Sequence, residues 1–243
     1  MTRPIMYTLD EQTGRNEMAR KRRKTRRKTR FMRRMRLYTR VGMVLLISTM
    51  AVLMGMKFFE VGPFQSKYVE QDDANMKIAK PNIDVRLLSV NPYSRPGTQS
   101  DKIENIVIHY TANPGTTAEQ NRNYFEGLKD SRKTRASSHF IVGLKGEIVQ
   151  CVPTWEIAYA SNERNADTVS IETCHKTKDG TYTKDTYESM VHLTAWLCEK
   201  FGLTEEDIIR HYDITGKICP KYFVDDEKAW QKFKADVKEL LEA

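Results

Sequence analysis

Residues 104–110 of the chain read ENIVIHY, and this stretch decides the fold. Its apolar run is short and β-branched, which favours a buried strand, and His109 closes it. Two later stretches repeat the arrangement: residues 169–174 read VSIETC, and residues 208–211 read IIRH. The sequence therefore predicts several buried strands that end at polar residues.

Patterns typical of helices separate these strands. Residues 117–128 follow a Thr N-cap at 116 or 117, and residues 187–201 are amphipathic and end at Gly202. A terminal helix is predicted over residues 227–241, and further strands over residues 83–90, 138–144 and 147–152. Strands interleaved with helices predict an α/β domain with a single mixed β-sheet flanked by helices.

The positive charge of the chain is concentrated near its start. The 243 residues carry 40 Lys and Arg against 32 Asp and Glu, a formal net charge of +8. Residues 1–40 hold 15 of the basic residues and three of the acidic ones, so this tail is +12 and the remainder is −4. A uniformly basic domain that coats nucleic acid is therefore excluded. The 40% of apolar residues also excludes wholesale disorder.

An uncharged segment follows the basic tail. Residues 41–56 read VGMVLLISTMAVLMGM, directly after thirteen Lys and Arg within residues 20–40. Sixteen residues of helix span about 24 Å, and flanking aromatic residues extend them toward the ~30 Å of a bilayer core. We expect a transmembrane helix at 41–59, with the basic tail, 1–40, in the cytoplasm. This topology predicts a single-pass protein of the cell membrane whose later residues are extracytoplasmic.

Other interpretations of this segment stay open. A cleaved signal peptide has the same layout, although no A-x-A-like site follows the apolar run. A buried soluble helix would show a polar face, and residues 20–36 alone could form a tail that binds nucleic acid. Residues 60–80 are polar and show no hydrophobic periodicity, which predicts a linker to a folded domain at 81–243.

Polar residues at the predicted strand ends suggest a site. His109 and His211 close two strands, Glu172 lies within a third, and Cys219 follows His211 by eight residues. Strand ends beside loops are where α/β proteins gather their sites. Two imidazoles and a thiolate could hold a zinc ion with one position open for catalysis. Core histidines and a buried cysteine are the alternative interpretation.

Four blocks carry a resemblance to a known family. They are IVIHYTANPGTTAEQNRNYF (106–125), ASSHFIVGLKGEIVQCVPTWEIAYAS (136–161), NADTVSIETCH (165–175) and IIRHYDITGKICPKYF (208–223). In order and spacing they resemble the zinc-dependent N-acetylmuramoyl-L-alanine amidases, the amidase type 2 family, which share the fold of peptidoglycan-recognition proteins. The resemblance covers residues 81–240. It implies a bacterial peptidoglycan hydrolase that cuts the amide bond between N-acetylmuramic acid and L-alanine, with Zn²⁺ as cofactor.

The resemblance also implies roles for single residues. His109, His211 and Cys219 match the family's zinc ligands, Glu172 its general acid and base, and Lys217 the residue near the substrate carbonyl. Many members have a catalytic Tyr where this chain has Ser138, so that role does not transfer and Glu172 must carry more of the proton transfer. An auxiliary role is expected for His139, and substrate contacts for Asn113, Arg122 and Asn162. Tyr124, Trp155 and Tyr159 are expected either to line a substrate groove or to pack in the core.

Three functions are weighed. The first is a membrane-anchored zinc amidase that remodels the cell wall, with peptidoglycan as substrate and a monomeric catalytic domain. The second is a non-catalytic peptidoglycan-recognition module, although such relatives typically lack the thiol that Cys219 supplies. The third is a membrane-tethered nucleic-acid protein, to which the net charge of −4 on residues 41–243 gives little support.

The other three cysteines, Cys151, Cys174 and Cys198, are expected in the core, and a Cys151–Cys174 disulfide stays open.

Overall fold

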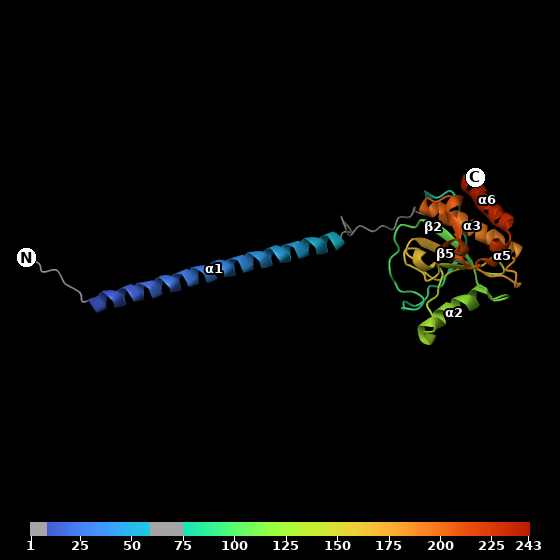
Figure 1. Ribbon diagram of the computed structural model, residues 1–243. Helices are drawn as coiled ribbons and strands as arrows, with labels where there is room; N and C mark the ends of the chain where they lie inside the picture. The colour runs from blue at the N-terminus through green and yellow to red at the C-terminus, as the bar shows by residue number, and fades with distance from the viewer. Residues whose placement is uncertain (1–8, 59–74) are drawn as a thin grey trace, which may run out of the picture. The chain divides into compact units, whose positions relative to one another are not determined.

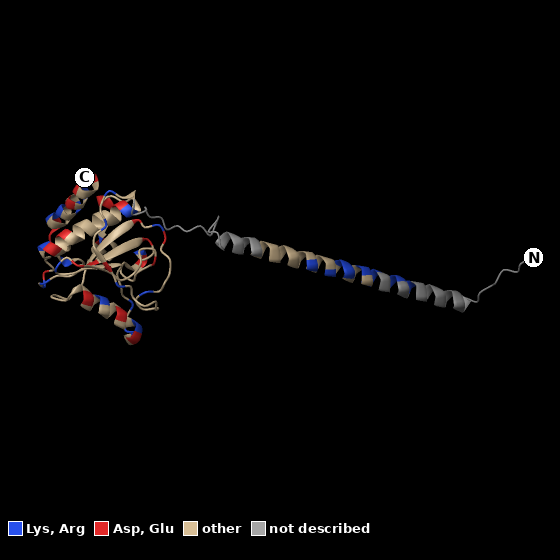
Figure 2. Ribbon diagram, turned by 180° about the vertical axis from the view of Figure 1, so that it is seen from behind, with Lys and Arg blue, Asp and Glu red and all other residues tan. Residues whose placement is uncertain are grey.

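The computed structural model describes residues 9–58 and 75–243 of the chain. The chain divides into two compact units, residues 1–65 and 66–243. In the first unit, α1 (Leu9–Phe58) is one continuous helix, and the side chains of residues 27–50 are all exposed. Figure 2 shows its described Lys and Arg along one stretch, followed by uncharged residues.

Residues 41–58 of the predicted transmembrane segment, 41–59, lie within α1. The structure describes the side chains of residues 41–50 of this segment. Among the described residues, no helix combines the length and the apolar character needed to span a membrane.

The second unit is built on a single six-stranded sheet with the order β1-β4-β3-β5-β2-β6. The strands are β1 (Ile83–Val85), β2 (Asn105–Tyr110), β3 (Phe140–Val142), β4 (Ile148–Gln150), β5 (Thr168–Thr173) and β6 (Ile208–Arg210). β3 and β4 run antiparallel, and the other neighbours run parallel. This arrangement confirms the mixed sheet that the sequence predicts.

Helices cover both faces of the sheet (Figure 1). α3 (Lys184–Phe201) and α6 (Glu227–Glu242) pack on one face, around a core that includes Phe223 and Phe233. α2 (Ala118–Ser131) covers the other face through Phe125, Leu128 and a smaller apolar cluster. Since one face of each helix is apolar, both layers bury their hydrophobic sides against the sheet.

The helix ends follow from local chemistry. Thr117 caps α2 in a capping box with Gln120, in which each side chain accepts from the other's backbone N–H. Gly202 ends α3 with a φ of 66°, the left-handed conformation that glycine adopts without strain. The three predicted helices are confirmed, and their bounds differ by a few residues.

Several short elements are absent from the sequence prediction. They are the 3-10 turns η3 (Asn162–Arg164) and η4 (Glu205–Asp207) and the helices α4 (His211–Thr215) and α5 (Lys221–Asp225). The prediction that His211 closes a strand is wrong, because β6 ends at Arg210 and His211 is the first residue of α4. A five-residue helix is too short to show a periodic signal.

The predicted linker, residues 60–80, falls outside the described residues up to residue 74. Its last residues pack on α3. The backbone N–H groups of Lys77 and Ile78 donate to the Glu199 carboxylate, both at 2.7 Å, and His192 contacts the Ala79 carbonyl. These residues therefore belong to the folded unit.

Candidate active site

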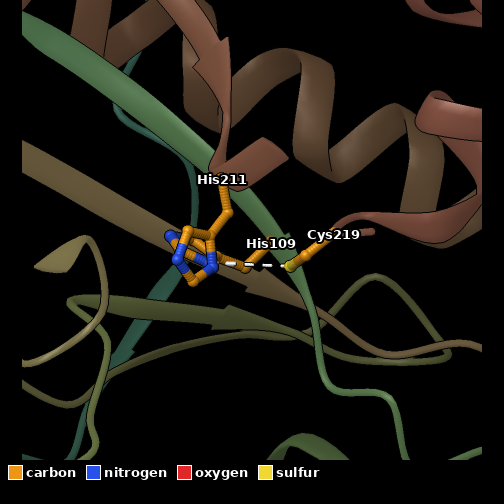
Figure 3. Close-up of side chains that lie close together, drawn as sticks. All are labelled: His109, His211 and Cys219. Atoms are coloured by element: carbon orange, nitrogen blue, oxygen red, sulfur yellow. Dashed lines mark hydrogen bonds between the residues drawn. The ribbon is translucent and has the colours of Figure 1, made fainter. Parts of the chain in front are cut away.

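His109, His211 and Cys219 come together at the end of the sheet (Figure 3). One ligand atom from each residue can be chosen so that all three lie within 4.8 Å of one another. The Cys219 Sγ lies 3.8 Å from the His109 Nδ1, and the two imidazole centroids are 4.7 Å apart. All three side chains are buried. The structure thus brings together the three residues that the sequence predicts as metal ligands.

The donor set fits a zinc ion. Zinc bound tetrahedrally to a sulfur and a nitrogen separates them by about 3.6 Å, close to the 3.8 Å between Cys219 Sγ and His109 Nδ1. In the part of the chain that the structure describes, the Nδ1 of His211 is buried without a hydrogen-bond partner. Buried polar atoms are normally paired, so this atom indicates a missing partner such as a cation.

Three different elements position the ligands. His109 lies in β2, which is held between β5 and β6, and Thr173 of β5 donates to the His109 carbonyl at 2.6 Å. His211 begins α4, and Gly216 ends that helix with a φ of 74°. The chain then reverses, and the Tyr212 N–H donates to the Cys219 carbonyl at 2.9 Å. The return loop thereby carries Cys219 back to the histidines.

Burial and charge keep both imidazoles neutral. Burial lowers the pKa of His109 well below its ordinary value, and repulsion from a protonated His211 and from Lys217 lowers it further. Burial and Lys217 also lower the pKa of His211. Burial raises the pKa of the Cys219 thiol to about 12. The neutral imidazoles can donate lone pairs to a metal, and Cys219 becomes a thiolate ligand when a cation displaces its proton.

Glu172 and Lys217 lie beside this cluster. Glu172 is aligned with His109 across the β2–β5 ladder, and its Oε2 has no hydrogen-bond partner among the described residues. Burial raises the pKa of the Glu172 carboxyl to about 7, while the positive charge of Lys217 acts in the opposite direction. A carboxyl group that titrates near neutral pH can both accept and release a proton.

These residues line one cleft of about 350 Å³. Its wall comprises His109, Tyr110, Phe125, Arg135, Ala136, Ser137, Tyr159, Ala160, Asn162, Asn165, Glu172, His211, Lys217 and Cys219. All five residues predicted to bind metal or act in catalysis are among them, together with Tyr159 and Asn162 from the predicted substrate contacts. A concave site with convergent polar groups is a typical binding site.

Five other predicted residues lie outside the cleft wall. Arg122 of α2 donates to the carbonyls of Arg86 and Leu87 at 3.1 and 2.9 Å. His139 is buried in the core, where its Nδ1 pairs with Ser170 Oγ at 3.0 Å and its Nε2 with the Glu156 carbonyl at 2.8 Å. Asn113 is in an exposed turn, and Tyr124 and Trp155 are 56% and 51% exposed. Their predicted substrate contacts would require a substrate that extends beyond the cleft.

The cleft also contains residues that the sequence reasoning missed. Arg135 stacks over the Tyr159 ring at 5.8 Å, and Asn165 accepts from the backbone of residues 160 and 161. Arg135 lies just before one of the four family blocks and Asn165 begins another, but neither follows a strand end or a residue that the resemblance marks as functional. Their loops approach β2 only in the folded domain.

The four cysteines are buried and free, so Cys151 and Cys174 form no disulfide. Burial raises the pKa of the Cys151 and Cys174 thiols to about 12 and keeps both protonated. Cys151, Cys174 and Cys198 thus pack in the core as expected, while Cys219 alone joins the cleft.

Relatives of known sequence resemble this domain. The chain is 36% identical over 167 residues to N-acetylmuramoyl-L-alanine amidase CwlL of Bacillus licheniformis, which covers 63% of the chain and 46% of CwlL. It is 35% identical over 172 residues to N-acetylmuramoyl-L-alanine amidase BlyA of Bacillus subtilis, which covers 62% of the chain and 45% of BlyA. The chain thus spans about half the length of these relatives.

Solved structures show the same fold. The catalytic domain of XlyA superimposes with a TM-score of 0.56 at 26% identity, covering 65% of the chain and 99% of that domain. A mutant endolysin from Bacillus subtilis gives a TM-score of 0.55, also at 26% identity and with the same coverage. The family model described as N-acetylmuramoyl-L-alanine amidase matches residues 99–222, half of the chain and all of the metal cluster. The chain therefore belongs to the N-acetylmuramoyl-L-alanine amidase family.

Proposed function

We propose that this chain is a zinc-dependent peptidoglycan amidase that hydrolyses the bond between N-acetylmuramic acid and L-alanine of the stem peptide. The observation that carries the proposal is the convergence of His109, His211 and Cys219 beside Glu172 in one cleft. Metal-assisted amide hydrolysis needs ligands for the metal and a group that transfers protons near neutral pH. Here the two neutral imidazoles and the thiol can serve as ligands, and the carboxyl group of Glu172 can transfer protons.

The three ligands would hold the metal in this cleft. A zinc ion bound there supplies Lewis acidity, which lowers the pKa of water and polarises a substrate carbonyl. Glu172 accepts the proton of the attacking water as the water oxygen bonds to the carbonyl carbon. Glu172 then delivers that proton to the alanine nitrogen as the C–N bond breaks. The products are a lactyl carboxylate on the sugar and a free peptide amine.

Lys217 has a different part in the reaction. Its ammonium group lines the same cleft, and its charge lowers the pKa of Glu172 and of both histidines. A fixed cation near the carbonyl oxygen stabilises the negative charge that develops there during attack. The same charge opposes the effect of burial on Glu172 and so favours the ionised form, which can act as a base.

We further propose that residues 41–59 anchor the protein in the cell membrane. On α1 the described apolar side chains Val41, Met43, Val44, Leu45, Leu46 and Ile47 are 49–63% exposed. Apolar side chains around a whole helix are unfavourable in water and favourable in lipid. The preceding cations favour a cytoplasmic N-terminus, which puts the catalytic domain on the side where peptidoglycan lies. A tether of this kind would limit cleavage to nearby wall and suits a remodelling enzyme.

The decisive experiment uses the purified full chain in detergent with isolated peptidoglycan. New alanine amino termini and new reducing sugar ends are both counted, with chelator and then with zinc restored. We expect new amines without new reducing ends, lost on chelation and recovered with zinc. Binding to peptidoglycan with neither product would instead indicate a recognition module, and new reducing ends would indicate a glycosidase.

A further inference from the structure

Asn162 contacts one of the three metal-binding residues. Its Oδ1 lies 3.0 Å from the Nε2 of His211. The other nitrogen of that ring, Nδ1, is buried and has no hydrogen-bond partner among the described residues. The two nitrogens of His211 are therefore in different environments, one facing an amide oxygen and one left for a ligand.

The chemistry of these atoms fixes the ring's proton. An amide oxygen can only accept a hydrogen bond, so the Nε2 of His211 must carry the hydrogen. A neutral imidazole has one N–H, so the lone pair of His211 is on Nδ1. Nδ1 is then the nitrogen that can bind a metal. We infer that Asn162 is a positioning residue that holds His211 in the tautomer and orientation needed to bind the zinc of the proposed amidase.

The loop around Asn162 is built to hold this oxygen in place. The backbone N–H groups of Ala160 and Ser161 both donate to Asn165 Oδ1, at 3.0 and 2.7 Å. Arg164 pairs with Asp167 at 2.9 Å and donates to Asn105 Oδ1 at 2.6 Å. Asn105 begins β2, the strand that carries His109. The loop is thus fixed to the same strand as the first metal-binding residue.

The backbone at position 162 favours this residue type. Asn162 has a φ of 53°, in the left-handed region. Among residues other than glycine, Asn enters this region most readily. Asn is therefore suited to position 162 both for its backbone and for its acceptor oxygen, and glycine would satisfy the backbone alone.

That distinction gives a matched pair of variants. Asn162→Gly keeps the left-handed backbone and removes the acceptor, and Asn162→Asp keeps an acceptor at the same reach. Loss of a residue that orients a metal-binding histidine typically weakens metal affinity by about 10–100-fold. We expect Asn162→Gly to bind zinc at least ~10-fold more weakly than the unchanged chain, and Asn162→Asp to retain most of the affinity.

The experiment titrates the full chain in detergent with zinc against a competing chelator and records the absorption spectrum after cobalt(II) replaces zinc. Asn123→Ala, an exposed residue of α2, is the control that should leave both readouts unchanged. Thermal unfolding of each metal-free variant measures any purely structural effect. A loss of affinity in Asn162→Gly with an unchanged unfolding temperature supports the inference.

Other outcomes overturn it. Zinc affinity of Asn162→Gly within twofold of the unchanged chain would show that the oxygen does not matter. An equal loss of zinc affinity in Asn162→Gly and Asn162→Asp would show that the loss comes from a changed loop conformation and not from the missing acceptor oxygen. Because the inference rests on the zinc site of the proposed function, zinc affinity is measured without substrate. A chain that binds zinc with the expected dependence on Asn162 but cuts no peptidoglycan would reject the proposed function alone. A chain that binds no zinc would reject both.

Discussion

Glu172 and His109 are aligned with each other in adjacent parallel strands, β5 and β2. Residues aligned in this way project from the same face of the sheet. The proposed proton carrier is therefore fixed beside the proposed metal by the hydrogen bonds of the sheet itself. A site built on strands holds its geometry more closely than one built on loops alone.

Replacement of Glu172 by Gln should separate metal binding from turnover. The amide keeps the size of the side chain but cannot accept the proton of water, so we expect kcat to fall by about 10²–10⁴-fold. Zinc content should stay unchanged because the three ligands remain. The measurement is alanine amine release together with zinc per chain, with Glu188→Gln, an exposed residue of α3, as the control. A near-normal rate in Glu172→Gln would remove Glu172 from the proton transfer.

The pH dependence follows from the same carboxyl group. Burial raises the pKa of Glu172 to about 7, and the base must be ionised to act. The rate should therefore fall about tenfold for each pH unit below this pKa, and a bound cation would move the midpoint lower. The measurement is kcat/KM against pH. A rate independent of pH between 5 and 8 would contradict the assignment of Glu172 as base.

Cys219→Ser should lose metal and activity together. Serine offers a poorly acidic hydroxyl in place of the thiol, and zinc binds thiolate far better than a neutral hydroxyl. We expect zinc per chain to drop toward zero after dialysis, without unfolding of the domain. Cys198→Ala, on α3 and outside the cleft, should keep its zinc. Unchanged zinc in Cys219→Ser would exclude Cys219 as a ligand.

Lys217→Ala should reduce kcat by about 10²-fold or more at unchanged zinc content, because a donor to the developing oxyanion is lost. It should also raise the pKa of Glu172, since the charge of Lys217 lowers that pKa in the unchanged chain. In a plot of kcat/KM against pH, the fall in rate on the acidic side should therefore begin at a higher pH. Lys217→Arg keeps the charge, so in that variant the fall should begin at the same pH as in the unchanged chain. A profile that does not move in Lys217→Ala would show that the two groups are not coupled.

Phe223→Ala should destabilise the domain without touching a ligand. Phe223 is fully buried, and its ring centroid lies 5.2 Å from that of Phe233 and 5.3 Å from that of Trp230. Removing such a side chain typically costs about 3–5 kcal/mol because it leaves a cavity. Urea unfolding should show this loss, with Phe223→Leu less affected. A change below about 1 kcal/mol would mean that the core repacks around the cavity.

The proposed anchor predicts how the protein fractionates. The full chain should sediment with membranes and resist a high-salt wash, because insertion of an apolar helix does not depend on charge. A chain without residues 41–59 should be released by high salt, which screens the attraction of the basic tail to anionic lipid. Release of the full chain by salt alone would contradict the anchor.

The features of this protein that could be predicted are those that leave a pattern in neighbouring residues of the sequence. Apolar strand runs and the periods of α2, α3 and α6 appear in the sequence, since burying one face of an element imposes a repeat. His109, Glu172, His211 and Cys219 stood out because their polar groups follow or interrupt apolar stretches. Family resemblance then assigned their roles, and the structure brought them into one cleft.

Only the tertiary structure decided the rest. In the structure His211 is the first residue of a short helix and not the last residue of a strand, and the Oδ1 of Asn162 contacts the His211 ring. The tertiary structure also left His139 in the core with both nitrogens paired. The physical reason is that hydrophobic periodicity is a local property of the sequence. The hydrogen-bond partner of a polar atom depends instead on which loops, distant in the sequence, lie close together after folding. By itself the sequence determined the sheet, its main helices and the candidate ligands, and folding selected the neighbours that orient them.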